Sequence, residues 1–84
     1  MPQVMVRHLA GVFTREQQTQ LMHDMIEAFV RIGGEGIRPN VNVTVEEVAS
    51  GLWSAGDQIL TTQEIIARRR QRREDDEKFT KPPS

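Results

Sequence analysis

The chain contains no cysteine and no tyrosine, and it has a single tryptophan. The lack of cysteine excludes disulfide bonds and leaves the redox compartment undefined. The two histidines, His8 and His23, fall in different predicted elements without a third ligand, so no metal site is expected. A domain of 84 residues buries only about 60% of the surface that its unfolded chain exposes. We therefore expect the association of subunits to supply the missing stability.

Long apolar runs are also absent, since no stretch approaches the ~20 residues that a membrane-spanning helix needs. The first eight residues lack the apolar segment of a signal peptide, so a cytoplasmic protein without a membrane partner is expected. The net charge is −1. Residues 1–60 hold four Arg or Lys against seven Asp or Glu, and residues 61–84 hold seven against five. This difference predicts an acidic body followed by a charged extension.

Hydrophobic periodicity predicts a strand, a helix and a second strand in that order. Residues 2–9 and 41–46 alternate as strands do, and the second alternation is carried by three valines. Between them, Thr14-Arg15-Glu16-Gln17 matches a helix capping box, and Gly33-Gly34 gives a stop. The apolar residues of this helix recur at helical spacing: Leu21, Met22, Met25, Ile26, Phe29 and Val30.

The predicted fold class is α+β. A strand–helix–strand unit should have parallel strands joined by a right-handed crossover. Residues 50–57 are rich in turn-forming types around Trp53 and predict a small hairpin. We therefore predict a β-α-β domain over residues 1–60 and a charged extension over residues 61–84. The extension should begin with a short helix whose apolar content ends at Ala67. Residues 81–84 should be disordered.

Pro2 opens the first predicted strand directly after Met1. Removal of Met1 would leave Pro2 with a secondary amine at the chain terminus. An amine acts as a base only when it is unprotonated, and burial or neighbouring positive charge favours that form. Because the ring fixes the direction of the nitrogen lone pair, Pro2 is a candidate general base. A proline that merely starts a strand is the alternative.

The order of these features resembles the 4-oxalocrotonate tautomerase family, the short-chain branch of the tautomerase superfamily. The resemblance covers residues 2–60. Its motifs are a proline at the start of the first strand, the capping box, the second strand with Glu46-Glu47-Val48, and Ser50-Gly51-Leu52-Trp53. It implies that two protomers pair into a four-stranded sheet and that three such dimers form a hexamer. It also implies a cofactor-independent tautomerase that moves a proton between carbon and oxygen positions of a small enol or 2-oxo carboxylic acid.

The same resemblance assigns site residues. Pro2 matches the catalytic proline, Trp53 matches the aromatic residue of the late hairpin, and Leu9 matches an apolar wall position. Arginines in this family bind the substrate carboxylate, and one of them should fall near residues 11–13, which contain none.

The second arginine of the family falls at Asn42, which offers a hydrogen bond but no charge. The nearest substitutes are Arg38, just before the second strand, and Arg7, on the first. We expect one of these two arginines to hold the substrate carboxylate, from the same or a neighbouring subunit.

Two other interpretations stay open. The unfilled arginine positions favour a tautomerase-fold subunit that is weakly active or inactive and serves as a structural or binding partner. The five arginines within residues 68–73 are typical of a contact with nucleic acid. The acidic residues 74–77 and the lack of interleaved aromatic residues argue against nucleic acid as a partner.

Overall fold

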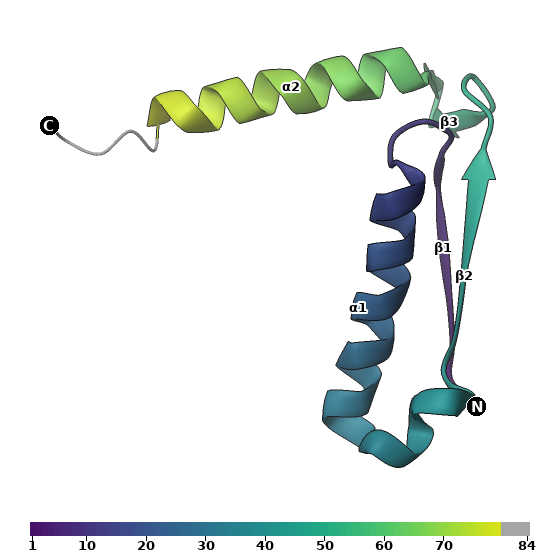
Figure 1. The fold of residues 1–84 in the computed structure, drawn as a ribbon. Coiled ribbons are helices and arrows are strands. Elements are labelled where there is room, and N and C mark those ends of the chain that lie inside the picture. Colours follow the sequence, from purple (N-terminus) through teal and green to yellow (C-terminus); the bar gives the residue numbers. More distant parts are fainter. Residues whose placement is uncertain (80–84) are drawn as a thin grey trace, which may run out of the picture.

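The computed structural model describes the backbone of residues 1–79 and the side chains of residues 1–76. A strand, a helix, a short 3-10 helix and a second strand come first, followed by a hairpin and a last helix (Figure 1). The disorder expected for residues 81–84 lies outside the described residues. The elements are β1 (Gln3–Leu9), α1 (Arg15–Gly33), η1 (Glu35–Asn40), β2 (Asn42–Val48), β3 (Trp53–Ala55), β4 (Gln58–Leu60) and α2 (Thr62–Phe79).

Strands β1 and β2 are parallel, as the strand–helix–strand order predicts. Their register pairs Gln3 with Asn42 at one end and Leu9 with Val48 at the other. Helix α1 lies along one face of this two-stranded sheet (Figure 1). Strands β3 and β4 form the predicted antiparallel hairpin. The predicted α+β class with a parallel β-α-β unit and a small hairpin is thus confirmed, whereas the four-stranded sheet needs a second chain and stays a prediction.

Helix α1 begins where the sequence predicts. The Thr14 hydroxyl accepts the backbone N–H of Gln17 at 3.1 Å, and the Gln17 side chain accepts the backbone N–H of Thr14 at 2.9 Å. Both bonds of the capping box are therefore present. The helix ends before Gly34, whose φ of 92° lies in a region that a side chain would disfavour. Residues 35–40, which connect α1 to β2, form the 3-10 helix η1.

The hydrophobic core of the single chain is small. Only Leu9, Val30 and Val41 are buried apolar residues among those described, at 5%, 8% and 7% exposure. The sheet face opposite α1 is open to solvent within the chain, and Met5 on that face is 54% exposed. Apolar side chains lie on both faces of β1, but α1 covers only one of these faces.

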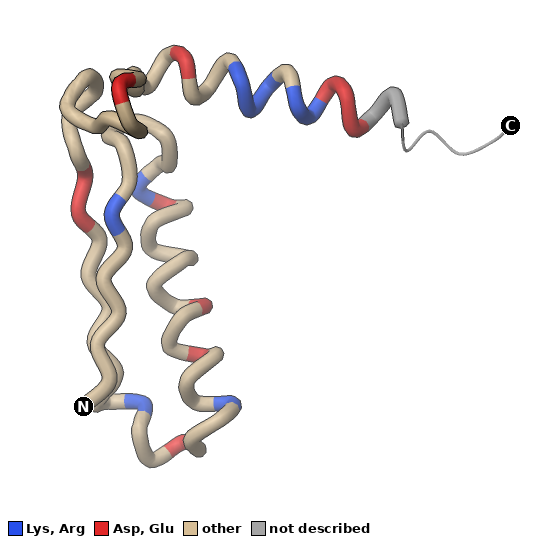
Figure 2. Tube along the Cα trace, turned by 180° about the vertical axis from the view of Figure 1, so that it is seen from behind, with Lys and Arg blue, Asp and Glu red and all other residues tan. Residues whose placement is uncertain are grey.

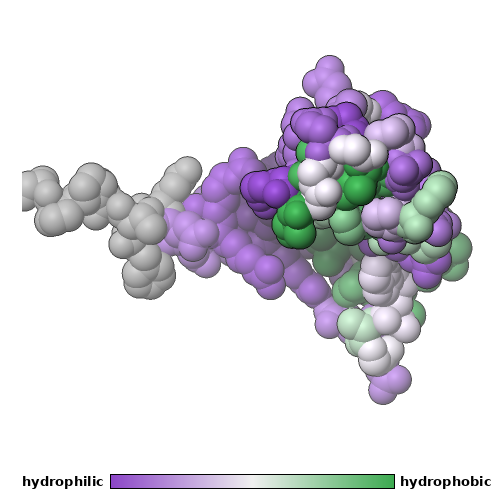
Figure 3. All heavy atoms as spheres, turned by 90° about the horizontal axis from the view of Figure 1, so that it is seen from below, coloured by the Kyte–Doolittle hydropathy of each residue, from purple (hydrophilic) through white to green (hydrophobic). Residues whose placement is uncertain are grey.

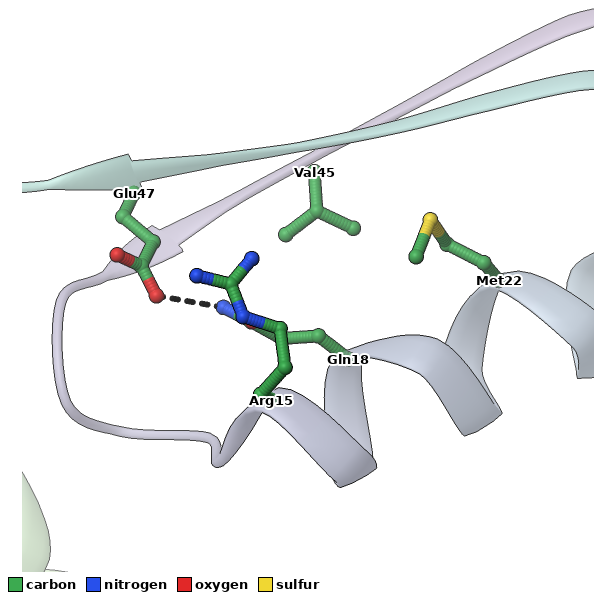
Figure 4. A pocket seen from close by; sticks show the side chains of 5 residues that line it. All are labelled: Arg15, Gln18, Met22, Val45 and Glu47. Carbon is green, nitrogen blue, oxygen red and sulfur yellow. Dashed lines mark hydrogen bonds between the residues drawn. The ribbon is translucent and has the colours of Figure 1, made fainter.

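A buried polar network joins α1 to both strands. Gln18, only 4% exposed, lies on α1 and donates from Nε2 to Oε1 of Glu47 on β2 at 2.6 Å (Figure 4). The same amide nitrogen lies 3.1 Å from Nε2 of His8 on β1. Since Nδ1 of His8 lies 2.7 Å from the Leu9 carbonyl, which only accepts, Nδ1 carries the proton and Nε2 accepts from Gln18. The network fixes the position of α1 over the sheet.

Helix α2 is longer than the sequence predicts. After Ala67 the sequence is polar and charged as far as Lys78, yet the helix continues to Phe79. Arginines and then acidic residues follow along it (Figure 2), and its surface is hydrophilic where it extends from the body (Figure 3). The bond from Gln71 to Asp75 is one i,i+4 contact that supports this exposed segment. The radius of gyration is 17.0 Å, whereas a compact chain of this length would have about 12 Å.

The start of α2 is attached firmly. The Thr62 hydroxyl donates to the carbonyl of Ala10, and the Thr62 backbone N–H donates to the Ser50 hydroxyl at 2.9 Å. Gly11 has a φ of 85°, and a Cβ there would lie 3.0 Å from the Thr62 methyl group. The loop after β1, the segment before the hairpin and the start of α2 are thereby held together at one end of the sheet.

Gln18→Met tests the polar network. Methionine keeps the volume of the side chain but leaves Nε2 of His8 without its donor, so the free energy of unfolding should fall by about 1–3 kcal/mol. Urea denaturation followed by circular dichroism measures this change. The matched control is Gln20→Met on the exposed side of α1, where Gln20 bonds only to Asp24. The control should stay within about 0.5 kcal/mol of wild type, and equal losses in both variants would show that the network does not anchor α1.

Candidate functional site

Pro2 and Asn42 lie together at one end of the parallel sheet. The backbone N–H of Asn42 donates to the carbonyl of Pro2 at 3.0 Å, which extends the pairing one residue beyond the start of β1. Pro2 is partly buried, and Asn42 is exposed. This bond ties the carbonyl side of Pro2 to β2, which limits the movement of the residue that carries the candidate base.

Leu9 and Trp53 lie together at the other end. Both line an apolar hollow of about 200 Å³ between the end of β1, the hairpin and the first turn of α2. Trp53 is held there by its pairing with Leu60 across the hairpin. The structure therefore brings the two expected wall residues onto one surface.

The two groups of residues are far apart within one chain. Leu9 lies seven positions after Pro2 along an extended strand, which at ~3.3 Å per residue corresponds to about 23 Å. No substrate of the expected size spans that distance. One chain thus carries the candidate base at one end of the sheet and the candidate wall at the other.

Arg38 is held by two carboxylates. Its guanidinium donates to both oxygens of Glu35, at 2.9 and 3.0 Å, and also to both oxygens of Glu27 on α1. These hydrogen bonds, of which those to Glu35 have the larger effect, raise the pKa of Arg38 above its ordinary value. The same bonds from Arg38 lower the pKa of the Glu27 and Glu35 carboxyls below their ordinary value. An incoming substrate carboxylate would have to displace one of them.

Arg7 has one acidic partner. Its Nε and Nη2 donate to the same oxygen of Glu46, at 3.2 and 2.9 Å, across the solvent-facing side of the sheet. Arg7 also contributes to the lining of the apolar hollow. Of the two arginines considered from the sequence, Arg7 is therefore the one that lies beside the wall residues.

The sequence missed three further residues of the hollow: Val12, Leu60 and Ile65. They come from the loop after β1, the hairpin and α2, so only the packing of these three segments brings them together. The buried contact of Gln18 with His8 was missed as well, because a glutamine on a helix face normally indicates solvent. A second hollow, of about 260 Å³, lies beside this contact and is lined by Arg15, Gln18, Met22, Val45 and Glu47 (Figure 4).

The arginine-rich segment of α2 is exposed throughout residues 68–73. One of its arginines, Arg69, donates to the carbonyl of Val12 at 3.1 Å. Acidic residues follow directly on the same helix (Figure 2). The segment therefore presents both signs of charge, which does not favour a nucleic-acid backbone over other partners.

Among residues 1–76, whose side chains the structure describes, no three His, Asp or Glu side chains are grouped so that they could hold a metal ion. In the same residues no helix combines the length and apolar character needed to cross a bilayer.

The ion pairs of Arg38 predict a pH dependence of stability. A carboxyl whose pKa is lowered in the folded state contributes stability that is present above its ordinary value of 4.5 and is lost as the pH falls through the lowered pKa. Arg38→Gln should thus be less stable than wild type at neutral pH, and the difference should shrink in acid. Thermal unfolding across this pH range measures it. Arg31→Gln, an exposed arginine of α1, is the control, and a difference for Arg38→Gln that does not change with pH would contradict the assignment.

Comparisons with known proteins were made at three levels. Neither a protein-family model, nor a curated protein, nor a solved structure matches this chain.

Proposed function

We propose that this protein is a cofactor-independent tautomerase of small enol or 2-oxo carboxylic acids, built from several copies of the chain. In this proposal Pro2 of one chain, freed of Met1, works against the apolar hollow of a neighbouring chain. The observation that carries this proposal is the arrangement along β1. This strand has a free edge, Pro2 directly precedes its first residue, and its last residue, Leu9, lines the hollow.

The free edge of β1 supports the association of two chains. Within residues 1–79, β1 pairs with β2 on one side only, so its other edge presents unpaired N–H and C=O groups. A twofold axis perpendicular to the sheet would pair this edge with the same edge of a second chain in antiparallel direction. The start of one β1 would then lie beside the end of the other. Each Pro2 would thereby approach the hollow of the partner chain, and the four-stranded sheet of the dimer would form.

The small core of the single chain also supports association. Three buried apolar residues are few for an independent domain. The solvent-facing side of the sheet carries Met5 and the ion pair of Arg7 with Glu46. Packing of dimers through this face would give the hexamer that the family resemblance implies, and it would cover surface that one chain leaves open.

The proposed reaction uses one proton and no cofactor. The unprotonated Pro2 nitrogen takes the proton of the enol hydroxyl, and the carbonyl forms. Pro2 then returns the proton to the carbon atom, so base and acid are the same group and nothing is consumed. Trp53 and Leu9 exclude water from one side of the substrate, and Asn42, whose backbone N–H donates to the Pro2 carbonyl, is a polar residue beside Pro2. Arg7, or Arg38 after release of an acidic partner, would bind the carboxylate.

A specific observation favours a second candidate function. Both guanidinium edges of Arg38 are occupied by Glu27 and Glu35, and Arg7 is shared with Glu46. A hydrogen-bond donor to a developing oxyanion contributes about 3–4 kcal/mol to catalysis in other enzymes. A chain whose arginines are bonded to its own carboxylates in this way would serve as a weakly active or inactive subunit with a structural or binding role.

An assay of phenylenolpyruvate ketonisation by the mature protein, monitored by ultraviolet absorbance, decides between the tautomerase and the structural or binding subunit. The rate should rise with pH through one ionisation, that of the Pro2 amine losing its proton. Pro2→Ala should lower kcat by at least about 100-fold, because the primary amine of alanine is more flexible and differently placed. A form that retains Met1 should be inactive, since the nitrogen of Pro2 is then an amide.

Sedimentation of each form controls for assembly, and all three should migrate alike and above the 9.6 kDa of one chain. Intact mass establishes whether Met1 is present in each sample. Equal rates in the three forms would leave the protein as a scaffold, and a folded wild-type monomer would remove the proposed site between chains.

A further inference from the structure

The apolar hollow has the size of one small hydrophobic group. Its volume is about 200 Å³, and a cavity of roughly 150 Å³ suffices to hold benzene in another protein. Five apolar side chains line it, and its exposed atoms are almost entirely apolar. These five are Leu9, Val12, Trp53, Leu60 and Ile65. A phenyl ring or a branched aliphatic group therefore matches both its size and its chemistry.

The lining of the hollow itself contains little positive charge. Arg69 is not part of the lining, and its Nη1 donates to the carbonyl of Val12. Arg7 is the only Arg or Lys in its lining, and the Nε and Nη2 of Arg7 are engaged by Glu46. His8, the other polar residue of the lining, has both ring nitrogens occupied, by the Leu9 carbonyl and by Gln18. One substrate carboxylate can reach the remaining Nη1 of Arg7. A second carboxylate would lie unpaired against apolar side chains, with the carboxylate of Glu46 beside the only cation, and that is unfavourable.

Resting on the proposed function, we propose that the substrate is a monocarboxylic enol or 2-oxo acid carrying one apolar group, and that dicarboxylic acids are rejected. The apolar group occupies the hollow, and the single carboxylate is held by Arg7. The reacting carbon then faces the edge at which Pro2 of a second chain would enter.

The first test compares two enol acids. The mature wild type should use phenylenolpyruvate with a kcat/KM at least about tenfold above that for 2-hydroxymuconate, a dicarboxylate of similar length. Val12→Thr keeps the shape of the wall but adds a hydroxyl, so it should reduce this ratio. Ile59→Thr is the matched control, because Ile59 lies on the same hairpin, is 54% exposed and does not line the hollow. The control should keep the wild-type ratio.

The second test uses the acidic partner of Arg7. Glu46→Gln releases the guanidinium, so kcat/KM for carboxylate substrates should rise several-fold through a lower KM. Arg7→Gln should raise KM instead. A ratio that favours 2-hydroxymuconate in wild type, or a Glu46→Gln variant without effect on KM, would overturn the proposed substrate class.

Equilibrium binding separates this proposal from that of the reaction. The unreactive acids 3-phenylpropanoate and hexanedioate report on the hollow without any use of Pro2. If 3-phenylpropanoate alone shifts the indole N–H resonance of Trp53 while no enol acid is turned over, the reaction fails and the ligand class stands. If hexanedioate binds as well as 3-phenylpropanoate, the ligand class is wrong whether or not Pro2 is a catalyst.

Discussion

The parallel pairing of β1 with β2 decides which residues lie at each end of this protein. A shift of the register by one residue would turn Val4 and Val6 away from α1 and would break the contact of Gln18 with His8 and Glu47. With the observed register, the chain places Pro2 at one end of the sheet. The apolar hollow then falls at the opposite end, so the proposed site requires two chains.

The distribution of charge follows from the same arrangement. The crossover brings Arg38 of η1 beside Glu27 of α1, and the register places Arg7 opposite Glu46. Each cation therefore has an acidic partner within the chain. A substrate carboxylate would have to compete with these partners, and this competition is the reason for the proposed preference for ligands with an apolar group and only one negative charge. The arginines of residues 68–73 follow on α2, and one of them, Arg69, donates to the carbonyl of Val12 beside the hollow.

Local features of the sequence predicted most of the fold. The capping box at Thr14, the stop at Gly34 and the alternating valines of β2 appear in the structure where their physical chemistry requires them. The length of α2 was not predicted, because beyond Ala67 it has no apolar face and only contacts between successive turns support it. Within the candidate site, Leu9 and Trp53 could be named from the resemblance. Val12 and Ile65 could not, because their meeting depends on how distant segments pack.

Mixing two variants in one oligomer tests most directly whether the site lies between chains. Pro2→Ala lacks the proposed base, and Trp53→Ala lacks the main wall of the hollow, so each alone should be nearly inactive. After subunit exchange in equal amounts, about a quarter of the sites should combine an intact Pro2 with an intact hollow from the other chain and regain activity. Recovery of that fraction, with exchange verified by native mass spectrometry, is the predicted result. Mixed oligomers that stay inactive, or single variants that keep full activity, would contradict a site built from two chains.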